Sequence, residues 1–257
     1  MNKKRVYFYL KLVLGLLALA SVFLTVRYFQ SRQKKSSVDL SAVSVDQTKE
    51  FNQSSGNITT QQTTTVKDQA ALPDKYLLKV AFASQAPFGD WSEPYENACE
   101  EASIIMTEHY LNNQDLSKEQ MKSEIDSSVA WEIANWGGHN DLNADKTLSL
   151  AKDYFHLSGK VVRNYSLSDI KKYISIGSPV LAPSAGRKLG NPNFRGSGPE
   201  YHMLVIIGYD DSQGIFITND PGTRKGEKYS YKYQTVLDAI SGPKSDMVKE
   251  LIVLSSR

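Results

Sequence analysis

The residue best suited to chemistry in this sequence is Cys99, the only cysteine among its 257 residues. Asn97 is a predicted N-cap, and Glu100 and Glu101 are acidic first-turn residues, so Cys99 is expected to begin a helix. The positive end of the helix dipole stabilises a thiolate there. The two glutamates oppose that effect, so a nearby imidazolium is needed to activate the thiol. The alternative is a buried, unreactive cysteine.

A second candidate group lies on a predicted β-hairpin. His202 stands near the start of the apolar strand Tyr201–Tyr209, Asp210–Gly214 forms a turn, and Ile215–Asn219 is the returning strand. The hairpin closes either with Asp210 opposite Gly214 or two residues tighter.

The two registers lead to the same neighbour for the imidazole. The first places His202 opposite Gly222, and the tighter one places it opposite Asp220, so Asp220 shares a face with His202 in both. A carboxylate in that position holds an imidazole in one tautomer. Asn219 is the alternative orienter, because its amide also accepts a hydrogen bond, but strand alternation turns it to the other face.

The elements that position these residues follow from periodicity and capping signals. We expect a mixture of helices and strands, an α+β pattern, in the folded part of the chain. The predicted elements are a strand over Leu77–Ala83, helices from Cys99 to about Asn112, from the capping box at Ser117–Gln120, over Asp145–Phe155 and after a Ser168 cap, a strand over Pro179–Ala182, and a long loop-rich segment over Pro183–Glu200.

Taken together, Cys99 at a helix start, His202 in an apolar strand and Asp220 after the returning strand resemble the C39-like peptidases of the papain-type cysteine protease group. The resemblance covers about Leu77 to Ile240. It implies a papain-like α+β fold in which the cysteine helix packs on an antiparallel sheet carrying the histidine. It also implies roles: Cys99 as nucleophile, His202 as general base, Asp220 as its orienter and Gln85 as oxyanion-hole donor.

Two features depart from the family pattern. Glu100 follows the cysteine where the family often has glycine, and a loop over Pro87–Pro94 separates Gln85 from Cys99. The predicted reaction is peptide or amide hydrolysis on a peptide or protein substrate. Two alternatives stay open: an acyl transferase or transpeptidase with the same Cys-His pair, and a non-catalytic module that binds a peptide or cell-wall component.

Other functional classes find little support. The net charge of +2, without a basic helix, argues against nucleic-acid binding. Neither His-Glu-x-x-His nor paired Cys-x-x-Cys occurs, and Gly-x-Ser-x-Gly is also missing, so zinc-enzyme and serine-hydrolase chemistry are not indicated. We therefore predict no cofactor and no metal.

The N-terminal part divides the chain into three regions. Residues 1–35 contain the apolar run Val6–Val26 with basic flanks, and about 21 residues at helical rise cover about 30 Å, enough to cross a bilayer. Residues 36–74 are a predicted disordered tether, rich in Ser, Thr and Gln, and 75–257 form the peptidase domain. Ala18–Ala20 fits a signal-peptidase site, but apolar residues follow it, which favours an uncleaved anchor. The expected location is the cell membrane, with one span and an extracellular domain.

Overall fold

The computed structural model describes residues 71–240 and 248–256. The chain divides into two units, 1–64 and 65–257, and every described residue lies in the second. The predicted anchor within 1–35, and the tether up to residue 70, lie outside the described residues. Among the helices of the described part, none combines the length and apolarity that a membrane crossing needs.

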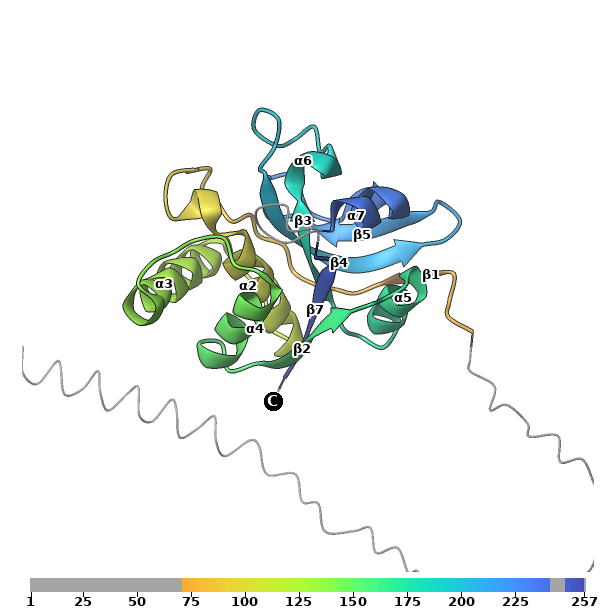
Figure 1. The fold of residues 1–257 in the computed structure, drawn as a ribbon, viewed down its shortest axis with the longest axis horizontal. Coiled ribbons are helices and arrows are strands. Elements are labelled where there is room, and N and C mark those ends of the chain that lie inside the picture. The colour runs from red at the N-terminus through yellow and green to blue at the C-terminus, as the bar shows by residue number, and fades with distance from the viewer. Residues whose placement is uncertain (1–70, 241–247, 257) are drawn as a thin grey trace, which may run out of the picture. The chain divides into compact units, whose positions relative to one another are not determined.

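A seven-stranded antiparallel sheet forms the centre of the described unit (Figure 1). Its main path runs β2-β7-β3-β4-β5-β6, and β1 pairs with β4 outside that path. The strands are β1 Lys75–Leu77, β2 Ser158–Arg163, β3 Val180–Ala185, β4 Tyr201–Asp210, β5 Ile215–Asn219, β6 Tyr229–Lys232 and β7 Glu250–Ser255. One side of β4 pairs first with β3, over Tyr201–Ile206, and then with β1, over Gly208–Asp210.

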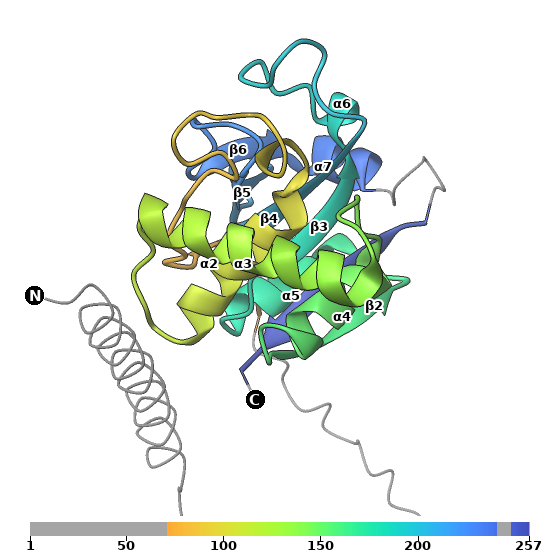
Figure 2. The same ribbon diagram turned by 90° about the vertical axis from the view of Figure 1, so that its left-hand side faces the viewer.

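The helices cover this sheet, and α2, α3 and α4 gather on one side of the strands (Figure 1). Seen from that side, α3 lies in front of the sheet (Figure 2). The helices are α2 Cys99–Leu111, α3 Lys118–Trp136, α4 Ala144–Asp153, α5 Leu167–Ser175, α6 Gly186–Leu189 and α7 Tyr233–Ala239, with a 3-10 turn, η1, over Tyr95–Asn97. Helix α2 packs against β4. The predicted α+β fold, with the cysteine helix on the antiparallel histidine sheet, is confirmed.

Strand β4 is buried at all of its positions, as its near-continuous apolar sequence predicts for a central strand covered on both faces. Gly208 allows β1 to lie close enough to β4 to pair with it. A Cβ at that position would lie 2.6 Å from the carbonyl oxygen of Tyr76, so a side chain there would push β1 away.

The β4–β5 hairpin closes one residue later than predicted. Asp210 pairs with Ile215, and the register then shifts between Ile206 and Gly208, which makes a β-bulge. Beyond the bulge, Val205 pairs with Asn219. This is the looser of the two predicted registers, the one that places His202 opposite Gly222. A bulge depends on packing along the whole strand, so the turn sequence alone does not reveal it.

The strand predicted over Leu77–Ala83 is wrong except for its first residue, because β1 covers Lys75–Leu77 and the chain after it leaves the ladder. The carbonyls of Val80 and Ala81 bond to a side chain instead of continuing the ladder. Both accept from Nδ2 of Asn219, at 3.1 and 3.3 Å. An amide from a neighbouring strand thus replaces the strand partner that the sequence pattern led us to expect.

Asn97 is not the N-cap of α2. It ends the η1 turn, and its side-chain amide donates to the carboxylate of Glu93. The N-cap residue is Ala98, which offers no side-chain cap. Helix α2 is therefore oriented by burial rather than by a capping hydrogen bond.

The capping box predicted at Ser117 is confirmed, with Ser117 and Gln120 bonding reciprocally at the start of α3. The cap predicted at Ser168 is wrong by two residues. Ser166 caps α5 through a reciprocal bond with Asp169, because Asp169 stands at the third helical position after Ser166.

Candidate active site

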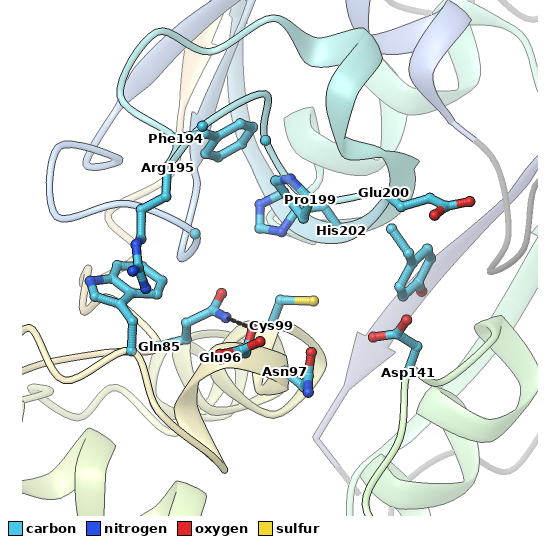
Figure 3. A pocket seen from close by; sticks show the side chains of 15 residues that line it. Gln85, Glu96, Asn97, Cys99, Asp141, Phe194, Arg195, Pro199, Glu200 and His202 are labelled. Atoms are coloured by element: carbon cyan, nitrogen blue, oxygen red, sulfur yellow. Dashed lines mark hydrogen bonds between the residues drawn. The ribbon is translucent and has the colours of Figure 1, made fainter.

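Cys99 and His202 line one cleft of about 700 Å³ (Figure 3). Cys99 is the first residue of α2, and His202 is the second residue of β4. Because α2 packs against β4, their first residues are brought to the same cleft. Gln85 lines it as well, whereas Asp220 lies behind His202.

The imidazole of His202 is fixed by a carboxylate. Nε2 of His202 lies 2.7 Å from Oδ1 of Asp220, and both side chains are buried. The same oxygen accepts the backbone N–H of Gly222 at 3.1 Å. A Cβ on Gly222 would lie 2.7 Å from Cε1 of His202, so only glycine leaves room for the ring. Nδ1 is the ring nitrogen left for a reacting partner.

The second carboxylate oxygen of Asp220 is held by two residues that we did not predict from the sequence. The hydroxyl of Tyr231 donates to Oδ2 at 2.6 Å, and Nδ2 of Asn191 donates to it at 3.2 Å. Burial by itself raises the pKa of Asp220, but the charge of His202 and the hydrogen bonds that Asp220 accepts lower it overall. The carboxylate is therefore kept ionised in a buried place.

Asn219, the alternative orienter, points elsewhere. Its Nδ2 donates to the carbonyls of Val80 and Ala81, and its Oδ1 accepts the N–H of Lys228 at 3.2 Å. The neighbouring side chains Asn219 and Asp220 thus serve different segments. Asp220 holds the imidazole, and Asn219 holds the backbone before the Gln85 loop.

The thiol of Cys99 has a different partner from the one expected. Its Sγ donates to Oε2 of Glu100 at 2.9 Å, and the other carboxylate oxygen of Glu100 accepts the N–H of Leu142 at 2.5 Å. Burial, and then the charge and hydrogen bond of Glu100, raise the pKa of the Cys99 thiol. In this resting arrangement the cysteine is therefore a thiol, and Glu100 opposes its ionisation as the sequence indicates.

Behind Cys99 lies a buried group of acids, formed by Glu100, Glu101 and Glu132. Within the described residues, the carboxylate oxygens of Glu101 and Glu132 have no hydrogen-bond partner. A proton on one of these two carboxyl groups would allow a hydrogen bond between them. Burial, and then the charge and hydrogen bond of Glu101, raise the pKa of Glu132 to about 10. Nε2 of His139 lies 3.7 Å from Oε1 of Glu101. Burial by itself lowers the pKa of His139, but the carboxylate of Glu101 raises it overall, so the acids favour a protonated imidazole here.

Gln85 lines the cleft, but its amide hydrogens face away from it. Nε2 donates to the carbonyls of Tyr95 and Glu96, at 2.9 and 3.1 Å. The backbone N–H of Gln85 donates to the carbonyl of Pro221, which joins this loop to the segment carrying Asp220. Its Oε1 is buried without a partner. The predicted oxyanion donor thus presents an acceptor to the cleft in this conformation.

One group in the described part of the chain has the spacing of metal ligands: Glu108, His109 and Glu124, whose ligand atoms lie within 4.8 Å of one another. Both ring nitrogens of His109 already have partners, the carbonyl of Asp115 at 2.7 Å and Glu124 at 2.9 Å. The described contacts therefore explain this histidine as a link between α2 and α3.

Comparison with known proteins finds a match to one family. A sequence model described as "Peptidase_C39 like family" matches residues 77–241 of the 257. No curated protein sequence matches the chain.

Solved structures that match the chain include a C39-like peptidase from Bacillus anthracis, with 19% identity and a TM-score of 0.48 over 71% of this chain and 98% of that one. Xylellain, a cysteine protease from Xylella fastidiosa, has 13% identity and a TM-score of 0.40 over 73% of this chain and 88% of its own.

Proposed function

This chain belongs to the Peptidase_C39 like family and is a cysteine peptidase, and we propose that Cys99 is its nucleophile, with His202 as general base and Asp220 as the orienter. The observation that carries these assignments is the bond between Nε2 of His202 and Oδ1 of Asp220 at 2.7 Å, beside a cleft that Cys99 also lines. A buried carboxylate on one ring nitrogen leaves the other to exchange a proton with the thiol.

The reaction begins with a turn of the Cys99 side chain. Rotation about its Cα–Cβ bond moves Sγ from Glu100 toward His202, whose Nδ1 takes the thiol proton. The thiolate attacks the substrate carbonyl carbon, and the imidazolium, stabilised by Asp220, returns the proton to the leaving amine. Water, deprotonated by His202, then hydrolyses the thioester and frees Cys99.

The negative oxygen of the tetrahedral intermediate needs hydrogen-bond donors. The first N–H groups of a helix have no partner within the helix, so the backbone N–H of Cys99 at the start of α2 is suited to this role. Gln85, the other predicted donor, contributes only if its amide releases Tyr95 and Glu96. Its donor role stays a prediction.

The test is peptide turnover by the full-length protein, measured by mass spectrometry on a mixed peptide library. We expect Cys99→Ala and His202→Ala each to abolish cleavage while the circular dichroism spectrum is kept. Turnover that survives Cys99→Ala would refute the assignment. An added amine separates the two acyl-transfer outcomes, because a transpeptidase yields the amine adduct and a hydrolase yields the free acid.

We also infer that the domain is held at the outer face of the cell membrane by the apolar run Val6–Val26. The apolar residues after Ala20 support an anchor over a cleaved signal peptide. The full-length product is expected to remain in the membrane fraction after a carbonate wash, with its N-terminus near Met1. A soluble product that begins near Ser21 would contradict the anchor.

A further inference from the structure

The cleft offers many hydrogen-bond acceptors near Cys99. Asp141 and Glu200 line it on the side toward which the Cys99 sulfur points (Figure 3). Both side chains are exposed, and no Lys or Arg within the described residues forms an ion pair with either. Two carboxylates without a Lys or Arg partner, beside a nucleophile, form a negatively charged wall.

A buried atom of the same cleft points to a ligand independently of this charge. Gln85 is 3% exposed, and its Oε1 has no hydrogen-bond partner. Its orientation is fixed, because exchanging O and N would set Oε1 against the carbonyls of Tyr95 and Glu96. In Figure 3 the oxygen stands on the side of the amide that faces the cleft. A buried acceptor of this kind needs a donor from outside the chain, which is a water in the free enzyme and a substrate N–H in the complex.

The like charges also affect one another. Asp141 reaches solvent, but the protein around it shields its carboxyl group in part. This shielding raises the pKa of Asp141, and the charges of Glu101, Glu200 and Glu93 add to the effect, whereas His139 opposes it. A cation bound beside Asp141 would relieve that repulsion. Arg195, the cation that lines the cleft, lies on the opposite side of Cys99 (Figure 3), so it does not neutralise this wall.

We propose that the cleft selects a peptide with a Lys or Arg side chain close to the scissile bond, with its cation between Asp141 and Glu200 and a substrate N–H donated to Oε1 of Gln85. This inference rests on the proposed peptidase function. The shared cleft places the reacting carbonyl at Cys99 while the basic side chain lies along the acidic wall. The segment on the far side of the bond meets Arg195, which disfavours a second cation there.

The experiment uses the full-length protein and peptides of one sequence that carry Lys, norleucine or Glu at each of three positions on either side of the bond. Norleucine matches the length of the Lys stem without its charge. At one position we expect kcat/KM for Lys to exceed that for norleucine about 1.5- to 5-fold, the range for exposed ion pairs, and this excess should fall with added salt.

Variants assign this preference to the wall. In Asp141→Asn/Glu200→Gln the ratio of kcat/KM for Lys over norleucine is expected to fall to about 1, and Glu200→Lys should favour the Glu peptide. Glu119→Gln, an exposed acid in the first turn of α3, is the matched control and should keep the wild-type ratio. A ratio near 1 in the wild type, or one that persists in the double variant, overturns the proposal.

Binding separates this inference from the proposed function. Cys99→Ala lacks the proposed nucleophile, so fluorescence anisotropy on this variant measures peptide recognition without turnover. Tighter binding of the Lys peptide than of the norleucine peptide supports the inference even if the wild type cleaves nothing, a result that would refute only the peptidase assignment. Equal binding of the two peptides overturns the inference even if Cys99-dependent cleavage is found.

Discussion

The buried carboxyl groups around Cys99 fall into two kinds, one ionised and one in which burial favours protonation. The carboxylate of Asp220 accepts four hydrogen bonds, from His202, Gly222, Tyr231 and Asn191, and stays ionised. The carboxylates behind Cys99 have few partners, and burial favours their protonated forms. The imidazole is thus held ready to accept a charge, while the resting thiol is kept neutral.

Glu100 is expected to set the reactivity of the resting thiol. Glu100→Gln replaces the carboxyl oxygen that accepts from Sγ with an NH₂ group that can donate to a thiolate, and it keeps an oxygen for the N–H of Leu142, so the pKa of Cys99 should fall. Iodoacetamide alkylation near pH 7 should then be several-fold faster than in the wild type, because a lower pKa raises the thiolate fraction. A pH profile of alkylation that coincides with that of the wild type would show that Glu100 does not hold the thiol; Glu119→Gln is the control.

Substitution of Asp220 should mainly lower activity, whereas substitution of its neighbour Asn219 should mainly lower stability. Asp220→Ala is expected to lower kcat/KM by about 10² to 10⁴, with Asp220→Asn costing less because an amide still accepts from the imidazole. Asn219→Ala strands the carbonyls of Val80 and Ala81 and should cost about 1–3 kcal/mol of unfolding free energy, with a smaller effect on kcat. Urea unfolding measures the change in stability, and steady-state kinetics measure the change in kcat/KM.

The reverse result, in which activity is lost only in Asn219→Ala, would make Asn219 the orienter.

Among the structural elements, the turn after β5 carries the most exacting packing. Gly222→Ala would place a methyl group 2.7 Å from Cε1 of His202, so we expect the ring to move and kcat/KM to fall by about 10². Gly138→Ala is the control, because its Cβ would meet only the side chain of Asn140, at 3.2 Å. Thermal unfolding should change little in either variant. Full activity in Gly222→Ala would mean that the turn yields without moving the imidazole.

Local signals account for the elements that could be predicted. The strand with His202, the returning strand and the start of α2 at Cys99 each follow from a short run of sequence, and the structure places all three as expected. Strand alternation also places Asp220 on the His202 face. The hydroxyl of Tyr231 and the amide of Asn191 could not be found in this way, since they meet Asp220 across 11 and 29 residues.

Contacts that depend on burial could not be predicted from the sequence. Glu100 is a first-turn acid by sequence, and such acids normally face water. Here the chain around Leu142 covers it, so it becomes the partner of the thiol. The amide direction of Gln85 likewise follows from two carbonyls of the η1 turn, which no motif encodes.

At the scale of the whole molecule, the buried acids link stability to pH. The usual pKa of a Glu is 4.5, and that of Glu132 is raised to about 10 by burial and then by Glu101. Between these values the folded state holds a proton that the unfolded state has lost, so the free energy of unfolding falls as pH rises. Below pH 4.5 the carboxyl is protonated in both states and contributes no slope.

Glu132→Gln should remove this dependence. A Gln amide stays neutral and can donate to Glu101, so near pH 8 we expect the variant to exceed the wild type by about 1–3 kcal/mol in unfolding free energy. Near pH 4.5 the two should be similar. Urea unfolding followed by circular dichroism at several pH values tests this, and parallel profiles across the range would show that Glu132 ionises normally in the folded protein.

The pairing of β1 with β4 also determines how mechanical load enters the domain. The N–H of Asp211 bonds to the carbonyl of Asp74, and β1 then pairs Lys75 with Asp210 and Leu77 with Gly208. His202 lies at the opposite end of β4. A pull on the segment before Asp74 is therefore borne first by this short pairing, at the end of β4 away from the imidazole.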